Sequence, residues 1–450
     1  MKTTKIFVPF ILLLAIAFSS SRAQVALTIY NNDLCLVREQ RSIEVQKGIG
    51  TVRFEDVAAR IDPTSVHFKS LTDPQGVVLL EQNFEYDLVG TARLLEKYIN
   101  QSLVVTSKEG NVFSGKLLNS DGGDVIMQSA DGQVKIIKSA SLVTVEFPSL
   151  PEGLISKPTL MWLLQSDKAG MHTSEISYLT QGMNWHAEYV AVTDAKDTQV
   201  ELSGWVSIQN NAGVTFADAK IKLVAGDVHT VRPERRLAKA AEVMTLGADM
   251  SQFQEKEFFE YHLYTLQRLS TVKDRQIKQL SLFSPATVKS AKQYVFDGQA
   301  RDSKVGVYLE FKNSASDGLG LPLPAGKVRV YKADEDKSQE FIGEDRIDHT
   351  PKDEKVRLYL GNAFDLVGER IEKSVQQVTD RSRRMTVEIK LRNHKKEDVS
   401  ISVVEHFYGD WEFVGPTPPI KKQDASSVEF VLAVPKDGEK VFEYTVLYKW

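Results

Sequence analysis

The chain has 450 residues, of which 26% are charged, and its 56 basic and 60 acidic residues are interspersed to give a formal net charge of −4. This balance gives no basic surface of the kind that binds nucleic acid, so nucleic acid is excluded as an expected partner. The single cysteine, Cys35, excludes an internal disulfide, and a chain of this length can instead bury large apolar cores.

The first residues have the features of a secretory signal peptide. Lys2 and Lys5 precede an apolar run over residues 6–18, and small residues follow up to Ala23. The apolar run is shorter than the ~20 residues of a membrane-spanning helix, and no later stretch supplies such a helix. We therefore predict a signal peptide over residues 1–23, export to the periplasm or the cell exterior, and a mature chain without a transmembrane segment.

Alternating polar and apolar residues predict β-strands after the signal peptide. Residues 24–85 contain four such runs and are expected to form an N-terminal β-module, with Cys35 as a small buried side chain. In residues 86–147, the short helical stretch "TARLLEKYI" is followed by about five short strands separated by glycine-containing turns. This pattern predicts a small barrel that resembles SH3-like and Sm-like barrels, and residues 148–159 are predicted to be a linker.

The remaining chain is predicted to form a β-region over residues 160–300 and a C-terminal β-sandwich over residues 301–450. Residues 232–258 are rich in Ala, Glu, Lys and Arg and break the alternation, so we interpret them as a helical or mobile insertion. The fold class is therefore predicted as mainly β, with multidomain antiparallel sandwiches and a small barrel segment. The clearest alternation puts four apolar residues on one face of a strand: Met385, Val387, Ile389 and Leu391.

Several ordered motifs between residues 160 and 450 resemble a known family. They include "SYLTQGMNWHAEYVAV", "GLGLPLPAGKVRVY" and "FIGEDRIDHTPKDEKVRLYLGNAFDLVGER". Together they look like the DUF4139 family of exported bacterial proteins, a domain of unknown function, and residues 29–57 resemble the N-terminal module that often precedes it. Relatives described as mucoidy inhibitor-like carry long helical coiled coils between the two modules, whereas here the barrel-like segment stands in that place. The resemblance implies export and implies no particular reaction.

The densest group of chemically active side chains lies in one short stretch and comprises Glu344, Asp345, Asp348 and His349. Carboxylate oxygens suit a hard cation, and the imidazole suits a further ligand or a base. Against this, Arg346 and nearby lysines can neutralise the carboxylates, and the residues around Pro351 have the composition of a turn. We favour a structural turn between two strands, and a metal or acid/base site is the alternative.

Two further places combine a histidine with a carboxylate. His186 and Glu188 are two residues apart and share one face of a predicted strand, while Trp185 faces the other side. Glu405 and His406 are adjacent and point to opposite faces, so they cannot act together without a bulge. For both places a polar outer face is favoured over a metal site or proton relay. The chain contains no phosphate-binding loop, zinc-binding helix motif or nucleophile elbow.

From these observations we expect no cofactor and no metal. The favoured function is that of an exported, non-catalytic β-rich protein, an envelope or surface binding module whose partner is an unknown envelope protein or glycan. The alternative is a metal-dependent or hydrolytic enzyme acting on envelope glycans or peptides. In that case Asp345, Asp348 and His349 are expected to form its polar centre.

Overall fold

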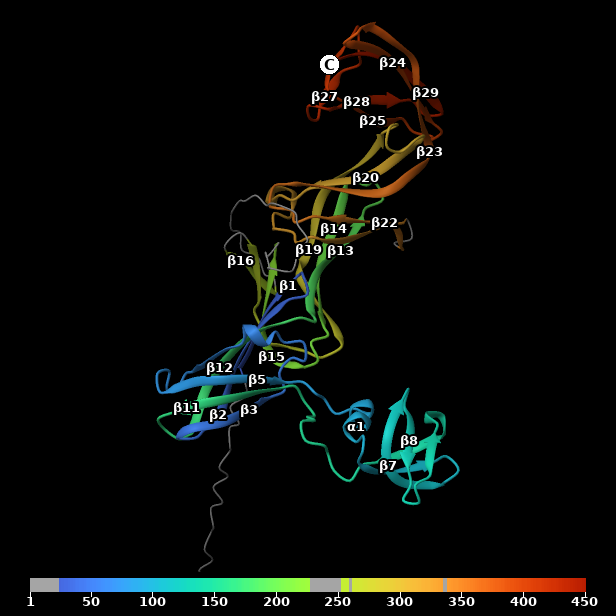
Figure 1. Ribbon diagram of the computed structural model, residues 1–450. Coiled ribbons are helices and arrows are strands. Elements are labelled where there is room, and N and C mark those ends of the chain that lie inside the picture. The colour runs from blue at the N-terminus through green and yellow to red at the C-terminus, as the bar shows by residue number, and fades with distance from the viewer. Residues whose placement is uncertain (1–23, 227–251, 259–260, 335–337) are drawn as a thin grey trace, which may run out of the picture.

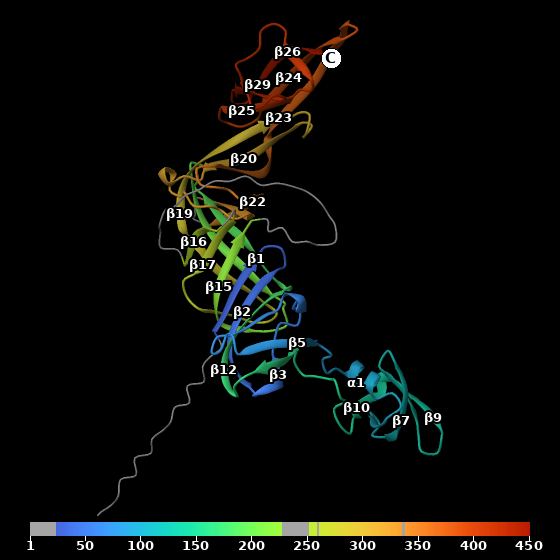
Figure 2. The ribbon, with the colours of Figure 1, turned by 60° about the vertical axis from the view of Figure 1, so that its left-hand side comes forward.

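The computed structural model describes residues 24–226, 252–258, 261–334 and 338–450. In these residues the chain is mainly β, with a single short α-helix and four sheets, which confirms the predicted fold class. Figures 1 and 2 show an elongated molecule with the first strands near one end, the last strands at the other end, and a small barrel set to one side. The predicted signal peptide lies outside the described residues.

The first sheet brings distant parts of the chain together. Strand β1 (Gln24–Tyr30) pairs antiparallel with β2 (Cys35–Val45) and parallel with β15 (Phe216–Ala225). The predicted N-terminal module therefore shares a sheet with strands of the predicted β-region over residues 160–300. Cys35 is buried, as expected, and burial raises the pKa of its thiol. The other strands of this sheet are β4 (His67–Ser70), β12 (Gly170–Thr180), β16 (Phe253–Phe258), β17 (Tyr261–Leu266) and β18 (Ser270–Val272).

A three-stranded sheet has β11 (Thr159–Ser166) between β3 (Gly48–Glu55) and β5 (Val77–Glu85). The strand β11 carries the buried Trp162, whose indole N–H donates to the Gln82 side chain at 3.0 Å. Glu85 at the end of β5 lies directly opposite Thr159 at the start of β11. The 73 residues between them are therefore an insertion between two neighbouring antiparallel strands.

The insertion forms the small barrel seen apart from the main body in Figures 1 and 2. It has its own core, which includes Leu95 and Tyr98 from the helical segment and Val105 and Val125 from the strands. The two segments that connect it to the main body are hydrogen-bonded to each other, since the backbone N–H of Val89 donates to the carbonyl of Ile155 at 2.9 Å. Its elements are α1 (Thr91–Lys97), β6 (Ser102–Ser107), β7 (Val112–Asp121), β8 (Asp124–Gln128), β9 (Val134–Ile137) and β10 (Leu142–Glu146).

The largest sheet runs through the middle of the molecule to its C-terminal end (Figure 1). Its first five strands in spatial order are β22 (Gln339–Ile347), β21 (Gly326–Ala333), β13 (Met183–Thr193), β14 (Gln199–Asn210) and β19 (Gln276–Phe296). The order continues through β20 (Lys304–Lys312), β23 (Lys355–Thr379), β24 (Ser382–Asn393), β29 (Gly438–Lys449) and β26 (Asp410–Phe413). The strands β25 (Val399–His406), β28 (Ser427–Val434) and β27 (Ile420–Lys422) complete the C-terminal sandwich.

Long strands connect two large cores. In β19, Leu282 and Val288 pack in the central core, whereas Phe296 packs in the C-terminal core. In β23, Leu358 belongs to the central core and Leu366 to the C-terminal core. The change from one core to the other therefore occurs within continuous strands, and β21 and β22, which follow residue 300, pack with the central core.

One predicted element is wrong in part. The helical or mobile insertion was expected over residues 232–258, but residues 253–258 form strand β16, which pairs antiparallel with β17. The stretch "FQEKEF" alternates only weakly, and its strand is stabilised by main-chain pairing to the sheet edge rather than by a local pattern. The rest of the expected insertion, up to residue 251, lies outside the described residues.

Candidate functional site

The four side chains of the densest polar stretch are distributed over a strand and a turn. Glu344 lies on β22 and forms ion pairs with Lys327 at 3.1 Å and Arg329 at 3.7 Å. Asp345, one residue further, accepts hydrogen bonds from the backbone N–H groups of Tyr359 at 2.7 Å and Arg346 at 2.8 Å. These two carboxylates thus connect β22 to its neighbours rather than facing a shared centre.

Asp348 and His349 lie beyond the end of β22, in the turn that leads to β23. The His349 ring accepts a hydrogen bond at Nδ1 from the backbone N–H of Ala325 at 3.1 Å, and the Thr350 hydroxyl donates to the Asp348 carbonyl at 2.8 Å. Among the described residues, no three His, Cys, Asp or Glu side chains are grouped so that they can hold a metal ion. The turn therefore packs against residues 323–325, through the hydrogen bond of Ala325 to His349 and the backbone pairing of Leu323 with Thr350.

Glu188 connects the second candidate pair to the first. Its carboxylate lies 3.7 Å from the His186 ring, accepts hydrogen bonds from Ser207 at 3.2 Å and Gln279 at 3.0 Å, and lies 3.7 Å from Arg329. Because Arg329 also pairs with Glu344, the structure joins Glu188 and Glu344 in one polar row across strands β19, β14, β13, β21 and β22. Trp185 is buried on the opposite face of β13, as its position in the sequence predicted.

Glu405 is separate from the other candidates and is buried in the C-terminal sandwich. Its carboxylate lies 3.1 Å from the Arg370 guanidinium and accepts hydrogen bonds from the Tyr444 hydroxyl and from Gln299 at 3.3 Å. Burial raises the pKa of Glu405 despite these partners. The neighbouring His406 turns to Asp297 at 2.9 Å instead. The side chains of Glu405 and His406 thus have different partners, as their adjacent positions in a strand predicted.

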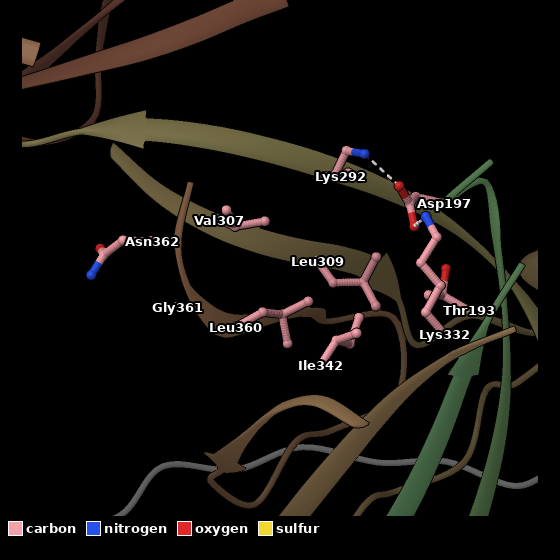
Figure 3. Close-up of a pocket in the computed structure, with 10 residues that line it drawn as sticks. All are labelled: Thr193, Asp197, Lys292, Val307, Leu309, Lys332, Ile342, Leu360, Gly361 and Asn362. Atoms are coloured by element: carbon pink, nitrogen blue, oxygen red, sulfur yellow. Dashed lines mark hydrogen bonds and ion pairs between the residues drawn. The ribbon is translucent and has the colours of Figure 1, made fainter. Parts of the chain in front are cut away.

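The structure also contains a pocket of about 280 Å³ that the sequence did not indicate. It lies at the passage from the central core to the C-terminal core, since Leu309 packs in the first and Val307 packs against the second. Figure 3 shows its lining side chains. We call it the lysine pocket, and it is lined by Thr193, Asp197, Lys292, Val307, Leu309, Lys332, Ile342, Leu360, Gly361 and Asn362.

One end of the lysine pocket is charged. Asp197 is only 7% exposed, and its carboxylate is shared by two ammonium groups, that of Lys332 at 2.6 Å and that of Lys292. Burial lowers the pKa of Lys292, but the hydrogen bond to Asp197, together with the charges of Tyr294 and Asp197, outweighs it, so the pKa lies above its ordinary value. The three charges leave this end with a net positive charge.

The other walls are apolar and depend on two β-bulges. Opposite β21, Gly343 and Phe341 have register partners and Ile342 between them has none; opposite β20, Gly361 and Tyr359 have partners and Leu360 has none. A bulge adds one residue to a strand and redirects its side chain. Both extra residues line the pocket, and each precedes a glycine with positive φ.

Sequence reasoning missed the lysine pocket because its charged residues come from three distant segments and form no local motif. Asp197 lies in the turn between β13 and β14, Lys292 is 95 residues later, and Lys332 is a further 40 residues along. The only local signal was a glycine after an apolar residue inside a strand, at Gly343 and Gly361, which is typical of a bulge.

Comparisons with known proteins supply no relative for this site. No protein-family model matches the chain, and no curated protein matches it. Membership of the DUF4139 family therefore stays a prediction based on the motifs in the sequence. The function of the lysine pocket has to be inferred from its own chemistry, which combines a positively charged end, apolar walls and the amide of Asn362.

Proposed function

We propose that this protein is an exported, non-catalytic binding protein of the bacterial cell envelope and that it binds its ligand in the lysine pocket. The observation that carries the proposal is the pair of ammonium groups that share a single buried carboxylate beside an apolar wall. Ligand sites typically combine apolar walls with a few fixed polar groups. The volume of about 280 Å³ fits a small ligand or the end of a larger one.

The raised pKa of Lys292 supports binding rather than catalysis. A lysine that acts as a nucleophile needs a lowered pKa, so that it is neutral near pH 7. The pKa of Lys292 is raised, which keeps its ammonium group charged and suited to holding an anion. The carboxylate of Asp197 is engaged by both lysines, so it is not presented to a substrate as a general base.

The location in the envelope is proposed from the sequence. A charged start, an apolar run over residues 6–18 and small residues up to Ala23 support cleavage and export. Among the described residues, no helix is both long and apolar enough to cross a membrane. The ordered motifs that resemble the DUF4139 family are a second, independent support for export of the chain.

The alternative of a metal-dependent or hydrolytic enzyme is not favoured by a specific observation. It required Asp345, Asp348 and His349 to share a centre, whereas Asp345 and His349 accept backbone hydrogen bonds from β23 and from residue 325, respectively. Glu405, the remaining carboxylate candidate, is enclosed by Arg370, Tyr444 and Gln299. These contacts support structural roles for the candidate residues.

The proposed function is tested by filling the pocket. The variant Ile342→Trp places a large ring in the lysine pocket, and Ile277→Trp makes the same change at an exposed position of β19. The purified proteins are screened by thermal denaturation against small organic acids, peptides and glycans from envelope extracts. We expect at least one compound to stabilise the wild type and Ile277→Trp but not Ile342→Trp, since only a bound ligand raises the melting temperature by mass action. Equal stabilisation of all three proteins, or of none by any compound, contradicts the proposal.

A further inference from the structure

We propose that the ligand of the lysine pocket is a monocarboxylate with an apolar body, the chemistry found in an N-acyl amino acid with an apolar side chain. This inference rests on the proposed binding function and names the class of ligand. The same chemistry occurs in a free N-acyl amino acid and in the C-terminal residue of a peptide. Both sources are compared in the experiment below.

The net charge of the lining residues favours a ligand with a single negative charge. Lys292 and Lys332 bring two positive charges and Asp197 one negative charge, so one further carboxylate makes the group neutral. An ammonium group has three N–H donors; Lys332 uses one of them on Asp197, and Lys292 interacts with both Asp197 and Tyr294. The remaining donors can therefore hold a second carboxylate through charge-assisted hydrogen bonds.

Asp197 keeps the two ammonium groups in position before a ligand arrives. Its residue is fixed in a tight turn, with φ of 58° and a backbone N–H that donates to the Asp194 carbonyl at 3.1 Å. The Asp194 carboxylate is used within the same turn, where it accepts hydrogen bonds from Thr198 at 2.7 Å and Gln199 at 3.1 Å. A site that is ordered in advance loses less entropy when a ligand binds.

The other lining residues indicate the size and polarity of the rest of the ligand. Figure 3 shows Asn362 and Asp197 at opposite ends, with Val307, Leu309 and Leu360 between them. At ~30 Å³ for each water-sized group, the volume of about 280 Å³ limits the ligand to a small body. The Asn362 side chain at the far end accepts a hydrogen bond at Oδ1 from the Tyr359 hydroxyl at 2.9 Å, so this end of the pocket is polar but carries no charge of its own.

Titration calorimetry of the purified full-length protein at pH 7 tests the ligand class. N-acetyl-leucine is compared with N-acetyl-leucinamide, which lacks the charge, and with a tripeptide that ends in leucine. We expect the wild type to bind N-acetyl-leucine at least about tenfold more tightly than the amide, because a charge-assisted contact is lost with the carboxylate. If the tripeptide binds equally well, peptide C-termini are a source of the ligand; if it does not, the source is a free acyl amino acid.

Variants of the two lysines test whether they bind the carboxylate of the ligand. Lys292→Gln and Lys332→Gln are each expected to weaken N-acetyl-leucine binding about tenfold or more. The matched control, Lys289→Gln, changes an exposed lysine on the same strand, β19, and is expected to leave binding unchanged. Equal binding of the carboxylate and the amide, or equal affinity in all three variants, overturns the proposed ligand class.

The variant Asp197→Asn separates a binding role of the charges from a purely structural one. Asparagine tolerates the positive φ at this position, so the turn is retained. The amide oxygen of asparagine still accepts hydrogen bonds from the lysines and so keeps them in position, while loss of the competing charge raises the net charge of the pocket. We therefore expect N-acetyl-leucine to bind more tightly, and weaker binding contradicts a binding role of the net charge. If N-acetyl-leucine fails while another compound still distinguishes Ile342→Trp from the wild type, only the ligand class is wrong. If no compound does so, the proposed function fails.

Discussion

Buried charges in this protein are held by partners from distant strands. Glu405 on β25 is fully enclosed and meets Arg370 from β23 and the Tyr444 hydroxyl from β29. Asp197 is held in the same way by lysines from β19 and β21. A buried charge is tolerated only when it is paired and hydrogen-bonded, so each of these groups constrains the strands around it.

Replacement of Glu405 by glutamine tests this constraint. The change keeps the shape and leaves the Arg370 guanidinium, which is 10% exposed, with Glu372 as its remaining ion-pair partner among the described residues. We expect Glu405→Gln to lower the free energy of unfolding by about 3 kcal/mol, the lower end of the range for breaking a buried pair. Urea denaturation measures it.

The control for this prediction is Glu412→Gln. Glu412 pairs with Lys449 at 2.8 Å, and both side chains are about half exposed to solvent. Exposed ion pairs contribute little to stability, so the unfolding free energy is expected to stay unchanged. If Glu405→Gln is no more destabilising than Glu412→Gln, the buried network does not have the assigned role.

Single residues show where sequence reasoning succeeds and where it stops. The faces of Trp185, His186 and Glu188 followed from their alternation in a strand, and the structure has the same faces. The partners of Glu188 and Glu405 did not follow, because Arg329 and Arg370 come from strands whose pairing is not encoded near either carboxylate. Local periodicity predicts which way a side chain points but not what it meets.

At the scale of elements, the lysine pocket depends on departures from regular strands. The bulges in β22 and β23 place Ile342 and Leu360 in the pocket, and both depend on a glycine with positive φ. Regular alternation predicted β13 and β24 correctly. It did not predict the bulges, because a bulge is defined by the register against the neighbouring strand, which the local alternation of one strand does not contain.

The two bulge glycines differ in a way that alanine substitution can measure. A Cβ atom at Gly343 lies only 2.8 Å from the Leu360 carbonyl oxygen, whereas a Cβ atom at Gly361 meets nothing within 4 Å. Both substitutions carry the cost of positive φ, about 1 kcal/mol or more. The steric contact adds to this at Gly343, so we expect Gly343→Ala to lower the unfolding free energy clearly more than Gly361→Ala. Urea denaturation of both variants provides the comparison, and equal costs contradict the close approach of β22 and β23.

At the scale of the whole molecule, three cores are arranged along one chain. The central and C-terminal cores share the continuous strands β19 and β23, so they are mechanically joined, and the lysine pocket lies where one passes into the other. The barrel has a separate core and is connected only through the segments at residues 86–90 and 148–158. The short strands and glycine-containing turns of residues 86–147 predicted a small barrel, but not its position between paired strands, since strand pairing over 70 residues leaves no local pattern.

This arrangement predicts that the barrel can be removed without loss of the lysine pocket. Glu85 and Thr159 are direct partners on neighbouring antiparallel strands, so an Asn-Gly dipeptide in place of residues 86–158 closes them as a two-residue hairpin. We expect the shortened protein to give a β-type circular dichroism spectrum and to bind N-acetyl-leucine within about twofold of the full chain, because distant sites act independently. The excised segment, residues 86–158, is expected to unfold cooperatively on its own core. A shortened protein that aggregates, or that loses N-acetyl-leucine binding, would contradict this independence and show that the barrel stabilises the main body.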